Sequence, residues 1–329
     1  MSINIKDKKI LEQLDLDSKI STSRLAKNVR LSQQVVDYRI KKLIENGIIR
    51  QFGTIFNLSK IGFEQYRVLF ELSSVGEKEK NEIINYLKNH NKVYWAAIVG
   101  GKWDLFVVLF IKNYEEFDDF LDELFKKFPN MIKDYEALYV LYHELYQHKY
   151  LHKDKNNLRS IKLNLANPGE IIKLDKTDLI ILDQIKNNCR LSSLEISKKA
   201  NISYKTVQNR IKNLEEKGLI QGYRLFSKGE KYDYNAYLLL ISFSSYGREA
   251  EKRILSYSKS NESITQAFRV FGRWSLLLHI RTKNNSELQN LIIDLKNKYP
   301  IIGNYEIIPI FSDISIDNFP MSTELLTNL

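Results

Sequence analysis

Two short stretches of the chain, 171 positions apart, are rich in side chains that can hydrogen-bond to nucleic-acid bases or phosphates. One follows Ser32 and the other follows Ser203, and each contains the sequence Arg-Ile-Lys, at 39–41 and 210–212. Glutamine and asparagine can pair with adenine through two hydrogen bonds, while arginine and lysine can contact guanine edges or phosphates. The residues that we expect to contact DNA are Ser32, Gln33, Gln34, Tyr38, Arg39 and Lys41 in the first stretch and Ser203, Tyr204, Lys205, Thr206, Gln208, Asn209, Arg210 and Lys212 in the second.

The elements that must position these side chains are helices, because apolar residues recur among them at helical spacing. Val36, Ile40 and Leu43 form one stripe after the N-cap Ser32, and Gly47 ends the helix. A supporting helix over 6–14 and a short helix capped by Ser21 precede it, and residues 48–52 alternate like the start of a hairpin. This order predicts a winged helix-turn-helix, whose second helix of the pair enters the major groove.

The two helices predicted to contact DNA differ in charge at the position of Asp37. Asp37 in the first helix would repel phosphate, whereas Gln208 stands at the corresponding place in the second. We therefore expect the second helix-turn-helix to contribute more DNA affinity than the first. The alternative for each unit is a three-helix module that only holds subunits together.

Residues 3–145 return 171 positions later with no insertion or deletion needed to keep them aligned. The period is too long for a solenoid repeat of roughly 20 to 50 residues, so it indicates two fused subunits. The expected domains of the first copy are a winged helix-turn-helix over 1–60 and a ferredoxin-like domain over 61–150, followed by a linker over 151–173. In the second copy a winged helix-turn-helix is expected over 174–230 and a ferredoxin-like domain over 231–316, before a tail over 317–329.

The longer part of each repeat has the order βαββαβ, which predicts an α+β ferredoxin-like sandwich with helices on one face of an antiparallel sheet. The other face of the first sheet should be large and apolar and therefore buried against a partner. Its residues are Trp95, Ala97, Phe106, Val108 and Phe110, and their partly polar counterparts are Gln266, Phe268, Leu277, His279 and Arg281.

Composition favours a polyanion partner and a cytoplasmic location. The net charge is +10, and residues 1–60 carry 12 Lys and Arg against 6 Asp and Glu, while residues 61–150 carry 11 against 15. A lysine-rich surface that is simply solvated is the alternative. The single cysteine, Cys189, allows no internal disulfide, and neither a signal peptide nor an apolar run of about 20 residues is seen.

These motifs together resemble the Lrp/AsnC family of transcription regulators. The matching segments in the first copy are 5–11, 31–43, 47–49 and 101–105, and in the second copy they are 174–178, 202–203, 210–214, 218–220 and 272–274. The resemblance implies DNA binding, association through the sheets, and an amino-acid effector near the Gly-x-x-Asp hairpin at Gly100, Gly101 and Asp104. In the second copy Ser275 stands at the position equivalent to Asp104, so the carboxylate is missing and an effector site there should be weakened. The alternative for both hairpins is a tight turn that needs glycine.

An enzyme is the less favoured reading, since no nucleophile–base pair, phosphate-binding loop or metal-ligand spacing is present, and no cofactor is expected. Siroheme decarboxylases, a related branch that occurs as paired or fused copies, resemble this chain in carrying His and Arg on the sheet. His279, Arg281, Arg269 and Arg273 would be the corresponding residues, although the first copy has Val108 and Phe110 in place of His279 and Arg281.

Overall fold

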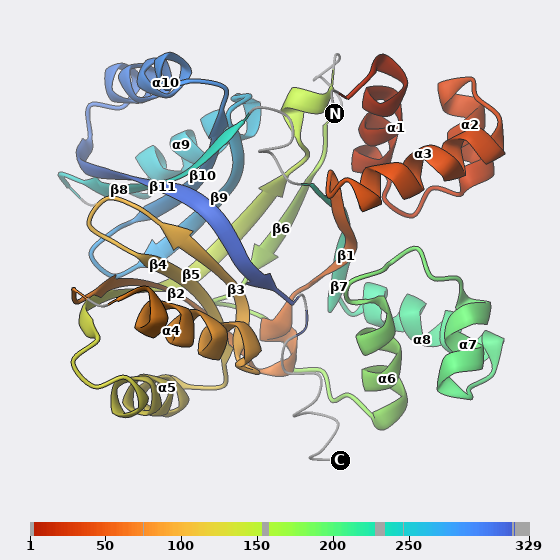
Figure 1. Cartoon of the computed structure of the whole chain (residues 1–329), viewed down its shortest axis with the longest axis horizontal. Helices are drawn as coiled ribbons and strands as arrows, with labels where there is room; N and C mark the ends of the chain where they lie inside the picture. The colour runs from red at the N-terminus through yellow and green to blue at the C-terminus, as the bar shows by residue number, and fades with distance from the viewer. Residues whose placement is uncertain are drawn as a thin grey trace.

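The computed structural model describes residues 3–74, 76–152, 158–227, 234–245, 247–317 and 319. Of the expected tail, only 317 and 319 lie within the described residues. Two helical units lie on one side of the molecule and a β-structure flanked by helices lies on the other (Figure 1). Within the described ranges, every helix is too short or too polar to span a bilayer.

Each helical unit has three helices whose start is fixed by a polar cap. Asn4 and Asp7 form a capping box at the first helix, and Asp175 and Asp178 form the same box in the second unit. The helices are α1 (Ile5–Leu16), α2 (Thr22–Val29) and α3 (Gln33–Glu45), then α6 (Lys176–Ile185), α7 (Ser193–Ala200) and α8 (Tyr204–Glu216). The apolar stripe predicted for α3 is confirmed, since Val36, Ile40 and Leu43 are buried.

A single strand follows each helical unit, and the hairpin expected there does not form. Strand β1 (Ile49–Phe56) leads into a 3-10 turn, η1 (Leu58–Ile61), and pairs antiparallel with β7 (Ile220–Ser227) of the other half. A lone strand leaves its backbone groups unpaired, and the duplicated strand supplies the missing partner. The wing is therefore shared between the two halves, which the sequence of either half alone could not reveal.

The two ferredoxin-like domains form one closed β-structure. The first contains β2 (Glu64–Leu72), α4 (Glu77–Asn89), β3 (Val93–Val99), β4 (Leu105–Ile111), α5 (Tyr114–Lys127) and β5 (Ile132–Tyr146). The second contains β8 (Asn235–Phe243), α9 (Arg248–Ser260), β9 (Ile264–Phe271), β10 (Leu276–Thr282), α10 (Asn285–Lys298) and β11 (Ile302–Ile316). Antiparallel pairing of β3 with β11 and of β5 with β9 joins the two sheets, and β2 pairs with both β4 and β5, so eight strands close into a ring.

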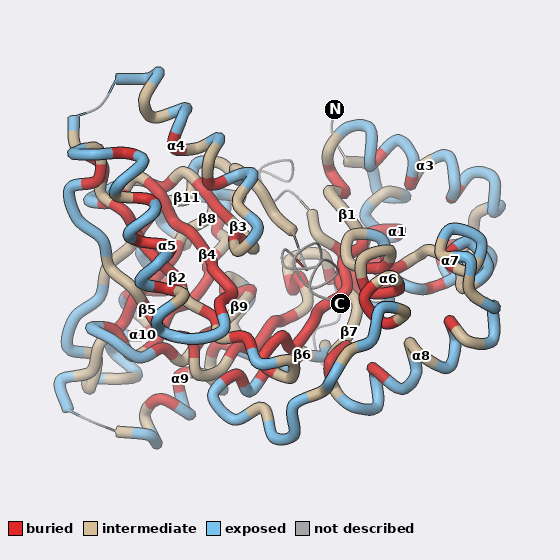
Figure 2. Tube along the Cα trace, turned by 90° about the horizontal axis from the view of Figure 1, so that it is seen from below, coloured by how far each residue is buried: buried red, intermediate tan, exposed pale blue. Residues whose placement is uncertain are grey.

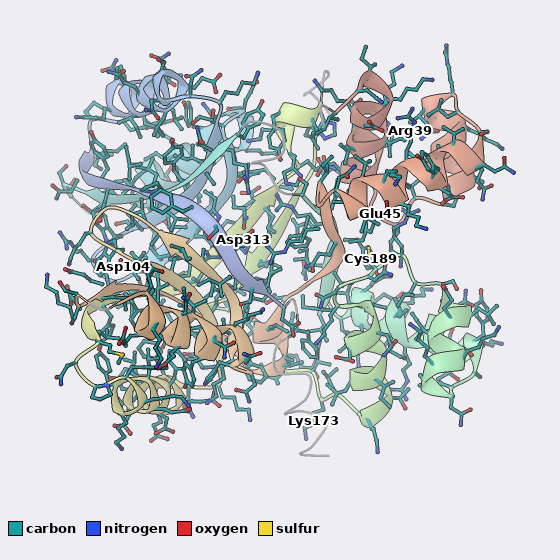
Figure 3. The ribbon with its side chains drawn as sticks, in the orientation of Figure 1. Arg39, Glu45, Asp104, Lys173, Cys189 and Asp313 are labelled. Atoms are coloured by element: carbon teal, nitrogen blue, oxygen red, sulfur yellow. The ribbon has the colours of Figure 1, made fainter. Side chains whose placement is uncertain are left out.

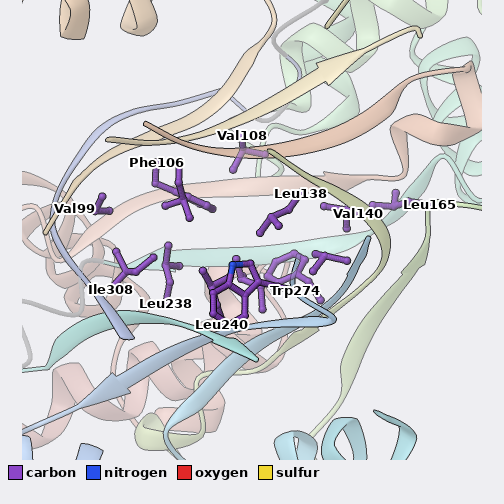
Figure 4. Close-up of a cluster of buried hydrophobic side chains, with 14 of the residues drawn as sticks. Val99, Phe106, Val108, Leu138, Val140, Leu165, Leu238, Leu240, Trp274 and Ile308 are labelled. Atoms are coloured by element: carbon purple, nitrogen blue, oxygen red, sulfur yellow. The ribbon is translucent and has the colours of Figure 1, made fainter. Parts of the chain in front are cut away.

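The sheet faces without helices meet each other inside this ring. Phe106 and Val108 from the first sheet and Phe268 and Leu277 from the second belong to one buried cluster, part of which is drawn in Figure 4. Figure 2 shows that the buried trace follows the strands while the outer helix turns are exposed. The prediction that the apolar face needs a partner is confirmed, and the partner is the other half of the same chain.

The segment expected to be a linker contains regular structure. It begins in a 3-10 turn, η2 (Lys149–Leu151), and includes strand β6 (Ser160–Asn164), which pairs antiparallel with β5. Leu163 and Leu165 pack into the cluster between the sheets. The segment thus covers the side of the β-structure that faces the helical units.

Candidate nucleic-acid interface and interior cavity

The two reading helices begin at the serines predicted to cap them. The Ser32 hydroxyl accepts a hydrogen bond from the Val35 amide at 3.3 Å, and the Ser203 hydroxyl accepts one from the Thr206 amide at 3.0 Å. Arg30 ends α2 in the left-handed conformation, at φ 56°, and Asn201 does the same for α7, at φ 53°. Each pair therefore makes the same tight turn, and α3 and α8 lie in the two helical units beside the paired strands β1 and β7 (Figure 1).

Most of the polar residues predicted to contact DNA are exposed on these two helices, together with Asp37. They are Ser32, Gln33, Gln34, Tyr38 and Lys41 on the first unit and Ser203, Tyr204, Lys205, Gln208, Asn209 and Lys212 on the second, with Thr206 half-buried. Two of them also contact one another, since the Gln208 side chain donates to the Tyr204 hydroxyl at 2.7 Å. The surface offers hydrogen-bonding groups and lysines, together with exposed apolar side chains such as Val35 and Ile44 on α3.

Arg39 and Arg210 have a different environment from their neighbours. Arg39 pairs with Asp7 at 2.8 Å, and Arg210 pairs with Asp175 at 2.6 Å and Asp178 at 3.2 Å. Both arginines thus bind the capping residues of the supporting helix and hold the reading helix against it (Figure 3 labels Arg39). A role for these two guanidinium groups in DNA contact stays a prediction, and the structure adds a positioning role.

The two helical units are fixed relative to each other by contacts besides the shared strands. The Thr54 hydroxyl donates to the Ile185 carbonyl at 2.7 Å, and the Cys189 amide donates to the Phe52 carbonyl at 2.7 Å. The Arg190 guanidinium donates to the Ser18 carbonyl at 2.9 Å. The spacing of α3 and α8 is therefore set by the protein rather than by the DNA.

The glycine hairpin proposed as an effector site is built around backbone contacts. The Asp104 carboxylate accepts the Leu72 amide at 2.8 Å, and Gly101 has φ +86°, which favours glycine. A Cβ on Gly100 would lie 2.6 Å from the Phe311 ring. The Ser275 amide donates to the Ile241 carbonyl at 2.9 Å, and Gly272, at φ +143°, has the Ala137 carbonyl 3.2 Å from its ideal Cβ position.

These hairpins lie far from the helical units. Figure 3 shows Asp104 at the end of the β-structure opposite to Arg39, with Asp313 between them. The structure therefore gives Gly100, Gly101, Asp104, Gly272 and Ser275 a role in turn formation. An amino-acid site at these five residues stays a prediction.

A second candidate site, which the sequence did not lead us to predict, is a cavity of about 130 Å³ between the two sheets and the paired strands β1 and β7. Among the described residues, four arginines and three histidines line it against a single carboxylate, that of Asp313. Asp313 is already engaged, because it pairs with Arg50 at 2.6 Å and accepts the Trp95 indole N–H at 2.9 Å. The remaining basic residues of the lining are Arg67, Arg224, Arg281, His143, His148 and His279.

Arg67 is the most unusual of these residues, because it is 3% exposed and has no carboxylate partner among the described residues. Its guanidinium lies 3.2 Å from Nε2 of His279 and 3.6 Å from the centre of the Phe268 ring. Burial lowers the pKa of Arg67 to about 9, so the group is still a cation at neutral pH. A buried unpaired charge is costly, and such groups gather at functional sites.

Two imidazoles beside Arg67 are neutral. Burial, together with the nearby charge of Arg67, holds the pKa values of His143 and His279 well below the usual range. His143 stacks on Phe268 at 3.9 Å and contacts Gln266 at 2.9 Å through Nε2, while its Nδ1 has no hydrogen-bond partner. The arrangement can receive an anion and can exchange protons with it. No group of three or more metal-ligating residues is found in the described part of the chain.

The basic residues of the cavity come from both copies of the internal repeat, but the equivalent positions in the opposite copy are not basic. The positions 171 residues from Arg67, His143, Arg224, His279 and Arg281 hold, in that order, Leu238, Ile314, Gly53, Val108 and Phe110. Leu238 and Val108 are fully buried in the cluster between the sheets. The two copies thus share one fold, but only one of each pair of equivalent positions carries a basic side chain.

Of the four residues considered for a decarboxylase, only two reach this cavity. His279 and Arg281 line it, but Arg269 pairs with Glu251 of α9 on the helix-covered face, and Arg273 pairs with Glu136 at 3.8 Å. His279 is buried, so it does not lie on a solvated hairpin edge. Arg67, His143 and Arg224 were missed, although a charged or imidazole side chain inside an alternating apolar strand is a usable signal.

Comparison with known proteins matches both halves of the chain. Residues 3–50 and 174–221 each match the family model described as winged helix-turn-helix DNA-binding. An uncharacterized HTH-type transcriptional regulator of Pyrococcus furiosus is 33% identical over 115 residues, which cover 35% of this chain and 76% of that protein. The HTH-type transcriptional regulator FL11 of the same organism is 32% identical over 117 residues, with coverages of 35% and 76%.

A solved structure matches the whole tandem arrangement. The crystal structure of the siroheme decarboxylase NirDL superposes with a TM-score of 0.64 at 16% identity, covering 98% of this chain and 98% of that one. Its co-complex with an iron-uroporphyrin III analogue gives a TM-score of 0.63 at 15% identity, with coverages of 98% and 99%. At this identity the likeness establishes a shared fold only.

Proposed function

Because the chain belongs to the Lrp/AsnC family of helix-turn-helix transcriptional regulators, we propose that it binds specific DNA as a built-in pseudo-dimer. The observation that carries this proposal is the exposure of equivalent polar faces on α3 and α8, in units joined by β1 and β7. One chain would then read two half-sites at a spacing fixed by the protein. The single buried cysteine fits action in the cytoplasm.

Selection of bound sequences from a random DNA pool tests this proposal. We expect two related half-sites at constant separation, with the stronger enrichment in the half read by α8. The bound stoichiometry would also show whether several chains associate on one site. Absence of any enriched sequence would contradict the proposal.

A pair of matched lysine variants separates DNA contact from general charge. Lys212 on α8 and Lys126 on α5 are both exposed and both pair with a carboxylate four residues away, at 3.7 and 2.6 Å. Lys212→Ala should weaken DNA binding by about three- to tenfold and reduce its salt dependence, because a phosphate contact is lost. Lys126→Ala should leave both unchanged, and equal effects would exclude a specific reading surface.

The same regulator is modulated by an anionic molecule, with a carboxylate or a phosphate group, bound in the interior cavity. Three observations on the part of the chain that the structure describes support this part of the proposal: Arg67 is buried without a carboxylate, Arg224 has an unpartnered Nη1, and the single lining carboxylate is occupied by Arg50. A carboxylate or phosphate would supply the missing counter-charge. The volume is below the roughly 300 to 1,000 Å³ of common ligand sites, so a large ligand requires the walls to move.

Two variants distinguish the cavity from the glycine hairpin as the effector site. Arg67→Leu should abolish binding of a carboxylate ligand in the cavity, while Asp104→Asn should not affect it. Calorimetric titration of each variant with amino acids and with uroporphyrin III, which carries eight carboxylates, measures the binding affinity. The opposite pattern would place the effector at the hairpin.

A siroheme decarboxylase activity is the second candidate, favoured by the neutral imidazoles His143 and His279 beside Arg67. Arginine can hold a carboxylate while an imidazole exchanges a proton. Anaerobic incubation of the purified protein with siroheme, followed by visible spectroscopy and mass measurement, tests it. Loss of carbon dioxide from siroheme would support this candidate, and an unchanged pigment would exclude it.

A further inference from the structure

A buried cluster joins the first helical unit to the β-structure. The Asp15 carboxylate, in the last turn of α1, accepts the His148 amide at 2.8 Å, His148 Nδ1 at 2.5 Å and His152 Nε2 at 2.8 Å. Burial alone would raise the pKa of Asp15, but His148 and His152 hold it well below its usual range. The carboxylate is therefore ionised and fixes the end of α1 to the segment that follows β5.

His148 also belongs to the wall of the basic cavity, so one side chain contacts both sites. Burial lowers the pKa of His148, and the positive charges of Arg224 and Arg281 lower it further, while Asp15 opposes them. The other groups facing this cluster are His152, Glu12, whose carboxylate lies 3.8 Å from His152, and Tyr150, which packs edge-on against His148.

The second helical unit is joined to the β-structure by different chemistry at the same place in the repeat. Lys186 stands 171 positions after Asp15 and pairs with Asp317 at 3.1 Å. Phe319 stands where His148 does and packs on Phe56 at a ring distance of 5.3 Å. Lys186 and Phe319 are not among the residues that line the cavity.

We propose that an anion bound in the cavity tightens the contact between His148 and Asp15, and so restrains the first DNA-binding unit without affecting the second. The inference rests on the proposed binding of an anion in the cavity. An anion that neutralises Arg224 and Arg281 removes the field that disfavours the imidazolium form of His148. The protonated ring then pairs with Asp15 as an ion pair, because opposite charges stabilise each other in a buried environment. His148 is a positioning residue that acts through Asp15.

Hydrogen exchange of the full chain, with and without uroporphyrin III and in the absence of DNA, tests this inference. We expect amides in the last turn of α1 to exchange about tenfold more slowly with the ligand, which corresponds to a stabilisation of about 1.4 kcal/mol. Amides at the end of α6 should be unchanged. Asp15→Asn should keep ligand binding and lose the α1 response, whereas the control Lys186→Met should keep both.

The outcomes separate this inference from the proposals on which it rests. If the wild type binds neither an amino acid nor uroporphyrin III, both the anion site and the coupling are wrong, whereas DNA binding is judged by the selection experiment alone. If it binds but α1 and α6 respond equally, or neither responds, only the coupling is wrong. The wild-type comparison decides this even where Asp15→Asn does not fold.

Discussion

Replacing Arg67 by leucine, the residue at the equivalent place in the second half, should stabilise the protein. Burial lowers the pKa of Arg67 from 12.5 to about 9. Each pKa unit corresponds to about 1.4 kcal/mol, so the charged group costs the folded state up to about 5 kcal/mol. Because a cation with a lowered pKa is charged in both folded and unfolded chains at pH 7, this cost is fully present there. It would fade only as the pH rises through about 9 towards 12.5.

Favourable contacts of Arg67 reduce the expected gain. Its guanidinium lies 3.6 Å from the Phe268 ring centre, worth about 2 kcal/mol in a desolvated setting. Its contact with His279 adds about 1 kcal/mol. We therefore expect Arg67→Leu to raise the free energy of unfolding by about 1 to 2 kcal/mol and to abolish binding of a carboxylate ligand in the cavity. Such a result would mean that Arg67 lowers the stability of the folded protein in return for ligand binding.

Urea unfolding followed by tryptophan fluorescence measures this change, since Trp95, Trp103 and Trp274 all lie in the β-structure. The matched control is Leu238→Arg, which introduces the same charge at the equivalent buried position. That variant should lose roughly 3 to 5 kcal/mol, as expected for an uncompensated buried charge. A loss of more than about 1 kcal/mol in Arg67→Leu would refute the reasoning, because Arg67 would then be part of the structural core.

Three further predictions follow from single positions. Asp37→Gln should raise DNA affinity several-fold at low salt, because an exposed carboxylate on α3 repels phosphate; fluorescence anisotropy with the selected site measures this, and no change would mean that α3 does not approach the backbone. Thr54→Val should lower the free energy of unfolding by about 1 kcal/mol through loss of the buried 2.7 Å bond to the Ile185 carbonyl, and an unchanged urea midpoint would show that this contact does not hold the two units together. Burial raises the pKa of Cys189 to about 12, so its thiol is protonated at neutral pH and should react with Ellman's reagent only after unfolding; rapid labelling of the folded chain would contradict its buried position.

Much of the fold followed from sequence because its signals are local. Serine caps, apolar stripes and terminal glycines predicted the helices of both units, and the duplication predicted a second domain of each kind. The alternation of Phe106, Val108 and Phe110 also predicted a buried sheet face. Strand β6 and the full length of β11 were not predicted, since their pairing partners lie far away along the chain.

The sequence by itself determined the two DNA-binding units, the two ferredoxin-like domains and the exposed polar faces of α3 and α8, because each depends on contacts within one short segment. Only the tertiary structure decided that β1 pairs with β7, that Arg39 and Arg210 bind capping aspartates, and that Arg67, His143, Arg224 and His279 meet in one cavity. These residues lie on strands far apart in sequence. Their shared environment, and the pKa shifts that it causes, exist only once the two sheets close on each other.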